Sequence, residues 1–466
     1  MIEEFIENKI TEHFGFEPTS EQQILIKKLS LFLVQPDYAN LFLLKGFAGT
    51  GKTSVVSALV KTFEELKQPV MLMAPTGRAA KVLSAYSAKS AFTIHRIIYR
   101  QKTSDAGSRF DLAFNNSKDC LFIVDEASMV ANMGDNTFGS GRLLDDLITY
   151  VYGGNNCRLL LLGDTAQLPP VMQTESKALD KSELESYGLK IAEFTLKQVV
   201  RQAEKSGILF NATLIRNIIE NENSPQSLCL QPAVDVIKSS SENFTEMLDA
   251  CYRNAGLEET IVVTRSNKRA SMYIEGIRNR VLYREEKVST GDLLMVVRNN
   301  YAFGKEYEGL DFIANGEIAE VVRVRGCTEL YDCSFLDVTL RFIDYDWEVD
   351  GKILLDSLYC PNAADLQELN KKLFASVEED YMDISNKRDR YKKMRNDVYL
   401  NALQVKFSYA ITCHKAQGGQ WENVFVDMGM IKKEDIDVPF LRWLYTAVTR
   451  ATQKLYLVNF SDDFFC

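Results

Sequence analysis

The sequence predicts an α/β protein with two parallel-sheet units and an all-β insert. Over the first 200 residues, short apolar runs alternate with amphipathic stretches, and Gly, Pro or Asp bounds each run, as is typical of buried parallel strands. A second α/β pattern begins near Ile261 and resumes after residue 400. Between its two parts, Gly291 to Leu355 alternates like successive strands without a helical pattern, which indicates a small antiparallel barrel inserted in the second unit.

Length and composition agree with this organisation. The chain has 466 residues, which at about 150 residues per domain corresponds to about three domains. Apolar residues make up 46% and charged residues 25%, as is ordinary for soluble globular proteins. The net charge of −10 excludes a basic footprint over the whole molecule, so nucleic acid could bind only at local basic patches.

The cysteines and histidines limit the kinds of metal, disulfide and catalytic site that the chain can form. The nine cysteines are odd in number and form no C-x-x-C pair, so we expect neither a disulfide framework nor a zinc module, and we expect a reducing, cytoplasmic location. The acidic start of the chain lacks the apolar stretch of a signal peptide, and the apolar runs are too short to cross a membrane, so we expect no membrane association. Only His13, His95 and His414 are present, which argues against a His-rich metal site or a His-based triad.

The individual elements follow from the same patterns. Apolar runs predict the strands of the two units, namely 41–44, 70–73, 121–124 and 158–162 in the first, and 261–263, 407–411, 424–426 and 455–458 in the second. Residues 97–118 are polar and irregular, so they read as a loop or short hairpin inserted in the first unit. Val338, Leu340 and Phe342 alternate with polar residues in the barrel segment, and residues 363–401 are charged and helical.

The sharpest motif is the phosphate-binding loop Gly46–Thr53, which fits G-x-x-x-x-G-K-[ST]. It follows a predicted strand and precedes a helical run, as this motif requires. Glycines let backbone N–H groups close around phosphate oxygens, Lys52 reaches the β- and γ-phosphates, and the Thr53 hydroxyl is a ligand for Mg²⁺. The motif therefore predicts a site for ATP and Mg²⁺.

Two further motifs follow predicted strands of the same unit. Asp125 and Glu126 end the 121–124 strand, where α/β proteins bind their ligands. We expect Asp125 to hold Mg²⁺ through water and Glu126 to orient or deprotonate the attacking water. Gln167, after the 158–162 strand, could hydrogen-bond the γ-phosphate, although a turn stiffened by the following prolines is the alternative.

Taken in order, the motifs resemble those of superfamily 1 helicases of the RecD-like branch, which includes Dda-type and Pif-type enzymes that move 5′→3′ on single strands. The resemblance covers nearly the whole chain. The segments that carry it, besides those above, are 18–23 (the adenine-reading Q motif), 74–80 (motif Ia), 93–95 (motif Ib), 196–202 (motif IV), 409–418 (motif V) and 444–451 (motif VI).

The resemblance implies two RecA-like P-loop NTPase domains with a small wedge insert in the first and an SH3-like β-barrel insert in the second. The implied first domain is 1–200 with the insert 97–118, and the second domain is 201–288 with 402–466. Residues 289–401 then form the barrel and the charged helical segment.

The resemblance also implies the residues of the ATP site. Catalytic roles fall to Lys52, Glu126, Gln167, Arg201 and Arg450, with the two arginines reaching from the second domain to the γ-phosphate. The implied nucleotide contacts are Gln22, Gly46, Ala48, Gly49, Thr50, Gly51, Lys52, Thr53, Ser54 and Gly418. Val200 cannot stack on adenine as an aromatic residue could, which leaves Phe16 as a weak candidate for that role.

A groove for the strand is implied at family positions that contact the sugar–phosphate backbone. Polar, mostly neutral contacts fit a grip that does not depend on base sequence. The implied residues are Pro75, Thr76, Arg78, Thr93, His95, Asn300, Thr412, His414 and Lys415. The asparagines of the barrel segment have turn formation as their alternative role.

The expected function is therefore an ATP-dependent 5′→3′ DNA helicase that acts as a monomer on single-stranded DNA and on junctions of single and double strands. One alternative is a RecD-like subunit of a nuclease–helicase complex, and another is a nucleotide-gated single-strand binding protein that does not unwind. Phe110 and Phe114 of the 97–118 insert could stack on the terminal base pair, or could simply pack the hairpin onto its domain.

Overall fold

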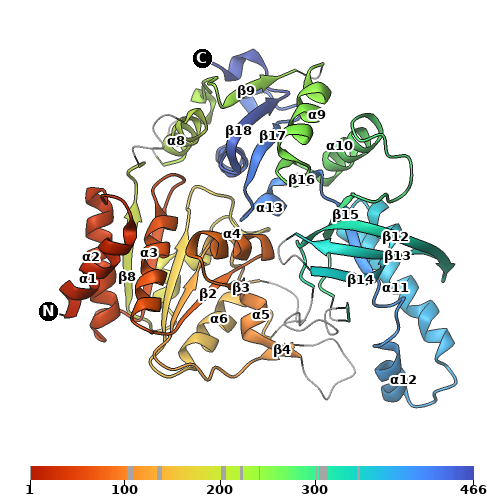
Figure 1. Cartoon of the computed structure of the whole chain (residues 1–466), viewed down its shortest axis with the longest axis horizontal. Helices are drawn as coiled ribbons and strands as arrows, with labels where there is room; N and C mark the ends of the chain where they lie inside the picture. The colour runs from red at the N-terminus through yellow and green to blue at the C-terminus, as the bar shows by residue number, and fades with distance from the viewer. Residues whose placement is uncertain are drawn as a thin grey trace.

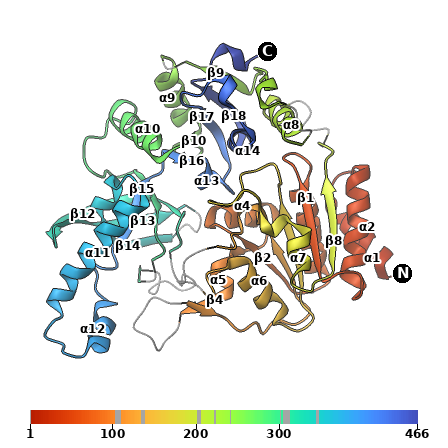
Figure 2. The same ribbon diagram turned by 180° about the vertical axis from the view of Figure 1, so that it is seen from behind.

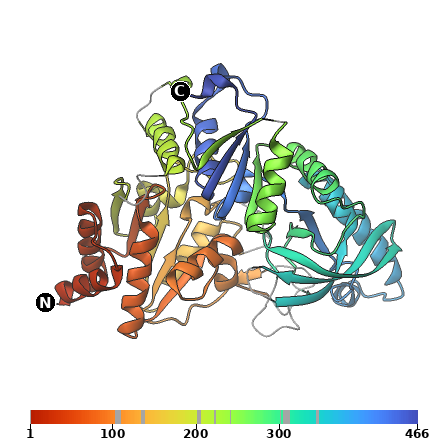
Figure 3. The same cartoon turned by 45° about the horizontal axis from the view of Figure 1, so that its top comes forward.

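A computed structural model of the chain shows two α/β domains and a β-barrel (Figure 1). It describes residues 2–101, 110–133, 139–200, 206–220, 224–240, 242–300, 302–303, 313–343 and 347–466. In Figure 3 the first domain lies at the lower left, the second domain at the top and the barrel on the right.

The first domain is built on a six-stranded parallel sheet with the strand order β3-β2-β6-β7-β1-β8. The strands are β1 (Leu41–Gly46), β2 (Val70–Ala74), β3 (Ala91–Thr93), β6 (Leu121–Val124), β7 (Arg158–Gly163) and β8 (Ile191–Leu196). All four strands that the apolar runs predicted are present. Because both faces of the sheet are covered by helices, these runs are apolar throughout rather than alternating.

Side chains that alternate along β1 separate the two cores of this domain. Phe42 and Leu44 pack on one face with helices α1 (Ile2–Phe14), α2 (Ser20–Val34), α3 (Lys52–Glu65) and α4 (Gly77–Ser87). Leu41 and Leu43 pack on the other face with α5 (Ile94–Ile98), α6 (Leu143–Tyr152) and α7 (Lys181–Glu185). Figure 2 shows the sheet from behind, with α6 and α7 in front of it.

The 97–118 insert contains an antiparallel hairpin of β4 (Tyr99–Gln101) and β5 (Phe110–Leu112). Residues 102–109 lie outside the described residues. Phe110 is only 6% exposed and packs in the core on the α5 and α6 face, whereas Phe114 is 80% exposed. Of the two roles left open for Phe110, the structure shows packing of the hairpin onto its domain, because the ring is part of the domain core.

The second domain contains a five-stranded parallel sheet with the order β16-β10-β17-β18-β9. Its strands are β9 (Val236–Ser239), β10 (Thr260–Thr264), β16 (Ala410–Thr412), β17 (Trp421–Asp427) and β18 (Ala451–Val458). Its helices are α8 (Gly207–Glu220), α9 (Phe244–Ala255), α10 (Asn267–Arg280), α13 (Cys413–Ala416) and α14 (Val438–Val448).

The inserted barrel is closed by five strands, β11 (Leu293–Val296), β12 (Ile318–Leu330), β13 (Cys333–Phe342), β14 (Trp347–Leu354) and β15 (Leu403–Phe407). Four strand pairs are antiparallel, and the pair of β14 and β15 is parallel. The helical segment between β14 and β15 provides the crossover connection that a parallel pair needs. Val338, Leu340 and Phe342 are buried in its core. The strand expected at 407–411 is divided, since Phe407 ends β15 in the barrel and β16 of the second domain begins at Ala410.

The charged segment between β14 and β15 forms α11 (Ala363–Asp380) and α12 (Lys387–Met394), as the sequence predicted. Leu373, Val377 and Met394 bury their side chains against the barrel residue Phe335. Arg390 of α12 forms an ion pair of 3.1 Å with Glu378 of α11. Within the described ranges, the helices include none that is long and apolar enough to span a bilayer.

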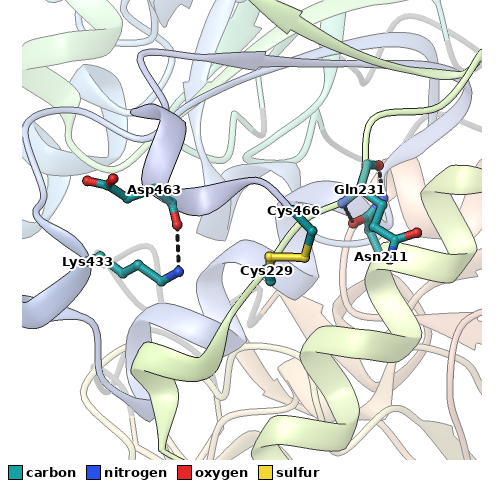
Figure 4. Close-up of a disulfide and its surroundings, with 6 residues drawn as sticks. All are labelled: Asn211, Cys229, Gln231, Lys433, Asp463 and Cys466. Carbon is teal, nitrogen blue, oxygen red and sulfur yellow. Dashed lines mark hydrogen bonds between the residues drawn. A yellow bond between two sulfur atoms is a disulfide. The ribbon is translucent and has the colours of Figure 1, made fainter.

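One expectation about cysteines was wrong. Cys229 and Cys466 form a disulfide that ties the C-terminal residue to the segment after α8 (Figure 4). The two residues are 237 positions apart, and they meet because the end of the chain pairs with Leu230, whose backbone N–H donates to Phe464 and whose carbonyl accepts from Cys466. Asn211 of α8 holds the adjacent Gln231 backbone with two hydrogen bonds of 2.8 Å. Spacing in the sequence gives no sign of such a long-range pairing.

Candidate nucleotide site and strand groove

The site residues gather because neighbouring parallel strands of the first sheet end at the same edge. Gly46 ends β1, Asp125 follows β6 and Asp164 follows β7. Pro75 and Thr93 stand at the corresponding ends of β2 and β3. The carboxyl edge of a parallel sheet is where α/β proteins bind ligands, so a single edge carries both the nucleotide site and part of the strand groove.

The phosphate-binding loop takes the backbone form that its glycines allow. Gly49 and Gly51 have φ values of +74° and +85°, and a Cβ on Gly51 would lie 2.4 Å from the Gln22 amide nitrogen. The Lys52 ammonium lies within the loop and donates to the carbonyls of Gly46 (2.6 Å) and Phe47 (3.0 Å). Loop amides and the N-terminus of α3 therefore face the same space as the lysine, which is suited to phosphate.

Gln22 supports this loop from α2. Its side chain completes a capping box with Thr19, accepting a 2.9 Å hydrogen bond from the Thr19 N–H, and its amide donates to the Thr50 carbonyl at 3.1 Å. Gln22 is buried, whereas Phe16 is 64% exposed. The adenine contacts of both residues stay predictions, and the role that the structure displays for Gln22 is to hold the loop.

Thr53 and Asp125 meet at the hydroxyl of Tyr86 near the end of α4. Tyr86 donates to one Asp125 carboxylate oxygen, and the Thr53 side chain lies close to the same hydroxyl. The other Asp125 oxygen accepts from the Glu126 N–H at 2.8 Å. Burial and the adjacent Glu126 raise the pKa of the Asp125 carboxyl, and the Tyr86 hydrogen bond and the Lys52 charge oppose that rise.

This donor set fits Mg²⁺. A hydroxyl and a carboxylate are oxygen ligands of the kind that Mg²⁺ prefers, and Mg²⁺ bound with a nucleotide takes its remaining ligands from phosphates and water. Thr53 and Asp125 would hold the ion beside the phosphate loop, where it would neutralise phosphate charge.

Glu126 faces an arginine of the second domain. Arg450 Nη1 lies 3.6 Å from Glu126 Oε1, and the Arg450 side chain is almost fully buried. Its guanidinium also donates to the carbonyls of Thr446 (3.1 Å) and Gly419 (3.3 Å), which fixes its direction. The structure therefore brings Glu126 and Arg450 together across the two domains, while the contact of Arg450 with a γ-phosphate stays a prediction.

Helix α14 also contacts the nucleotide site at the phosphate loop and at Asp164. The Tyr445 hydroxyl accepts from the Ala48 N–H of the phosphate loop and donates to Asp164. The next residue, Thr446, accepts a 2.8 Å hydrogen bond from the Leu168 N–H. The intervening Gln167 is buried, and its side-chain oxygen has no hydrogen-bond partner within the described part of the chain.

Motif V, residues 409–418, contacts the first domain beside α4. Gln417 donates a 2.7 Å hydrogen bond to the Leu168 carbonyl. Gly418 has φ +73°, and a Cβ there would lie 2.6 Å from that of Ala79. This glycine thus permits close approach of the two domains, while its nucleotide contact stays a prediction. Arg201 lies outside the described residues, but Val200 just before it donates its N–H to the Gly49 carbonyl at 3.0 Å.

A groove of about 340 Å³ runs where the two domains and the barrel meet. Most of the predicted strand contacts line it. The lining residues are Pro75, Thr76, Gly77, Thr93 and His95 of the first domain, His414 and Lys415 of the second, and Met295, Asn299, Ala314, Asn315 and Gly316 of the barrel. In Figures 1 and 2, α4 lies between the first sheet and α13, at the groove.

Lys415 is the one Lys, Arg, Asp or Glu side chain among the described residues that line the groove. Burial lowers the pKa of His95 to about 4, so its imidazole is uncharged at neutral pH. Desolvation also lowers the pKa of His414 and of Lys415. Hydroxyl, imidazole and carboxamide groups therefore dominate the lining, which suits contact with a sugar–phosphate backbone without reading base edges.

Three of the predicted strand contacts, Asn300, Arg78 and Thr412, are not among the described residues that line the groove, and their contacts with a strand stay predictions. The Asn300 side chain donates to the Asn401 carbonyl at 2.6 Å and accepts from the N–H groups of Ala302 and Phe303, so it stabilises a turn, and the neighbouring Asn299 lines the groove instead. Arg78 packs its guanidinium 4.1 Å from the Trp421 ring and donates to the Gln420 carbonyl, which joins the two domains. Thr412 precedes α13 and is not among the groove-lining residues.

Tyr86 and Tyr445 are the functional residues that sequence reasoning missed. Tyr445 lies inside the 444–451 motif, five residues before Arg450, and this position could have suggested a site contact. Tyr86 has no such signal, because it is nine positions beyond Gly77 on an otherwise ordinary helix.

Comparison with known proteins agrees with this arrangement. Residues 33–217 match the family model of an AAA domain, and residues 407–458 match that of the UvrD-like helicase C-terminal domain. The first range contains the phosphate loop, Asp125, Glu126 and Gln167, and the second contains α13, α14 and Arg450.

Individual relatives cover different parts of the chain. The uncharacterized protein R530 of Acanthamoeba polyphaga mimivirus is 24% identical over 94% of this chain and 98% of its own length. The ATP-dependent RecD2 DNA helicase of Deinococcus radiodurans is 37% identical over 36% of this chain and 21% of its own length. A crystal structure of Pif1 helicase from Bacteroides with ADP-AlF3 and ssDNA shares 15% identity, covers 97% of this chain and 95% of that one, and has a TM-score of 0.49.

The two matched domains are those that carry the paired Glu126 and Arg450, and they occur in the order that the motifs predicted. The chain therefore carries an AAA domain followed by a UvrD-like helicase C-terminal domain, and part of it is similar to a RecD2 DNA helicase.

Proposed function

We propose that the protein is an ATP-driven helicase that moves 5′→3′ along single-stranded DNA and unwinds the duplex ahead of it. The contact between Arg450 and Glu126 carries this proposal, because it joins the catalytic groups of two domains at 3.6 Å. Arg450 can reach the γ-phosphate side of the site only while the domains are closed, so closure and hydrolysis are linked.

Each step of hydrolysis has a residue to perform it. Lys52, Thr53 and Asp125 would hold the phosphates and Mg²⁺, and Glu126 would accept a proton from the attacking water. The Gln167 oxygen, which has no hydrogen-bond partner among the described residues, would orient that water. The Arg450 charge would stabilise the transition state, in which negative charge spreads over the phosphoryl oxygens.

The groove supplies the strand grip. Because both domains and the barrel line it, opening and closing of the domains would change the spacing of contacts along the strand and so move the protein. A DNA substrate is supported by the RecD2 relative, which is named as an ATP-dependent DNA helicase. The 5′→3′ direction is supported by the resemblance to that branch of the superfamily.

Three duplexes test the proposal, one with a 5′ single-stranded tail, one with a 3′ tail and one with blunt ends. With ATP and Mg²⁺, we expect strand separation of the 5′-tailed duplex alone. The Glu126→Gln variant under the same conditions controls for strand capture without hydrolysis. Separation of the 3′-tailed duplex alone would overturn the direction, and tight strand binding with ATP turnover but no separation would overturn the helicase assignment.

A further inference from the structure

Helix α4 connects the strand groove to the Mg²⁺ site. Thr76, its N-cap, and Gly77, its first residue, line the groove. Tyr86 lies near its other end, about 14 Å away at 1.5 Å per residue. One short helix therefore has the groove at its start and a side chain that touches Asp125 at its end.

Tyr86 is held firmly where it meets the site. Its backbone carbonyl accepts a 2.9 Å hydrogen bond from Ser57 of α3, the helix that begins with Lys52. Its hydroxyl donates to Asp125, and the Thr53 side chain lies close to it. The hydroxyl thus bonds to one of the two side chains that would hold the metal ion and lies beside the other, and it comes from a helix to which neither of them belongs.

We propose that Tyr86 is a positioning residue through which strand binding at the groove acts on the Mg²⁺ site. Its hydroxyl holds the Asp125 carboxylate, beside Thr53, in the orientation that Mg²⁺–nucleotide requires. A strand that contacts Thr76 and Gly77 acts on the same helix and so shifts or steadies Tyr86. The inference rests on the proposed function, since it assumes that the groove binds a strand and the loop binds a nucleotide.

The proposal has two parts, an effect of Tyr86 on Mg²⁺ affinity and a coupling between the Mg²⁺ site and the groove. Hydrogen-bond partners that orient metal ligands typically change metal affinity about 10- to 100-fold when they are removed. If the strand changes the affinity for Mg²⁺–nucleotide, linkage requires that Mg²⁺–nucleotide changes the affinity for the strand by the same factor. Residues of one helix move together, so a displacement at Thr76 reaches Tyr86 without unfolding.

Equilibrium binding of a fluorescent ADP analogue tests the first part, with the full chain and its Tyr86→Phe variant. Mg²⁺ should increase the affinity for the analogue, and we call the Mg²⁺ concentration that gives half of this increase the Mg²⁺ midpoint. We expect the Mg²⁺ midpoint to rise about tenfold in the variant. Affinity measured in EDTA should be unchanged, because the phosphate loop is intact. An unchanged Mg²⁺ midpoint would overturn the proposal.

Adding a single-stranded oligonucleotide tests the second part. In the wild type we expect the oligonucleotide to shift the Mg²⁺ midpoint severalfold, and in Tyr86→Phe we expect that shift to fall below about twofold. A raised midpoint together with a full oligonucleotide shift would overturn the transmission through α4.

Tyr152→Phe is the matched control, since it removes a tyrosine hydroxyl that donates at 3.1 Å to the Asn40 carbonyl elsewhere in the first domain. This control should keep the wild-type midpoint and the wild-type shift, and a change as large as that of Tyr86→Phe would overturn the specific role of Tyr86. Both read-outs are binding measurements without turnover. Failure of the wild type to unwind DNA would therefore count against the proposed function and not against the Tyr86 result.

Discussion

The hydroxyl of Tyr445, in the second domain, lies 2.6 Å from a carboxylate oxygen of Asp164, in the first domain, and donates a hydrogen bond to it. The same hydroxyl accepts a 3.0 Å hydrogen bond from the Ala48 N–H of the phosphate loop. Burial raises the pKa of Asp164, and the Lys52 charge and the Tyr445 hydrogen bond oppose that rise. A single side chain of the second domain thus bonds to two motifs of the nucleotide site.

Tyr445→Phe removes this link while keeping the ring. The Ala48 N–H and the Asp164 carboxylate lose a buried partner, at a cost of about 1–3 kcal/mol, so we expect the closed state to be less populated and strand-stimulated ATP turnover to fall about tenfold. Tyr252→Phe is the control, because the buried Tyr252 hydroxyl has no hydrogen-bond partner among the described residues. Equal loss of turnover in both variants would contradict the role of Tyr445.

Glu126→Gln tests the general base. The carboxamide keeps the shape of the side chain but cannot accept the proton of the attacking water, so we expect turnover to fall about 10²- to 10⁴-fold. Binding of ATP and of a single strand should stay close to wild type. Steady-state hydrolysis and equilibrium binding are the measurements, and normal strand-stimulated turnover would show that Glu126 is not the base.

Arg450→Ala should lower turnover far more than nucleotide affinity. The guanidinium lies beside Glu126, and its charge matters most when negative charge spreads in the transition state, so we expect a loss of about 10³-fold or more in kcat. Arg442→Ala, on helix α14 just before Arg450, serves as the control and should leave kcat unchanged. A collapse of affinity with kcat preserved at saturation would identify Arg450 as a ground-state contact.

Variants at Phe114 and Phe110 distinguish base stacking by the hairpin from packing of the hairpin onto its domain. Phe114 is 80% exposed, so Phe114→Ala should reduce duplex unwinding while ATP turnover on single strands stays near wild type, since base stacking contributes about 1–3 kcal/mol per base. Phe110 is a core residue, so Phe110→Ala should instead lower the free energy of unfolding by about 3–5 kcal/mol. Unwinding by Phe114→Ala at the wild-type rate would rule out stacking by Phe114.

His95 should make the fold sensitive to acid. Burial lowers its pKa in the folded state to about 4, whereas the unfolded chain takes up the proton near the ordinary value of 6.5. Stability is therefore lost as the pH falls from 6.5 towards 4, because over this range the unfolded state binds a proton that the folded state does not. His95→Gln should show a smaller fall in Tm between pH 7 and pH 5, and an equal fall would contradict the burial of a neutral imidazole.

Much of the nucleotide site could be predicted because it is encoded locally. The loop Gly46–Thr53 needs glycines at positive φ and a lysine at a set spacing, and both requirements are visible in eight consecutive residues. Asp125, Glu126 and Gln167 could be placed for a similar reason, since each follows an apolar strand and parallel strands end at one edge. The strand order of the two sheets was not predicted from these patterns.

Contacts between distant segments required the folded chain. Tyr86 reaches Asp125 across 39 positions and Tyr445 reaches Asp164 across 281, and nothing in their local sequence encodes either hydrogen bond. Asn299 lines the groove, whereas the adjacent Asn300 forms hydrogen bonds within a turn, and the sequence does not show which of the two side chains takes which role. Local patterns report the backbone conformation of a segment and which of its faces is buried, whereas the partner of a buried polar atom is set by how whole helices and strands pack, and that is a property of the assembled molecule.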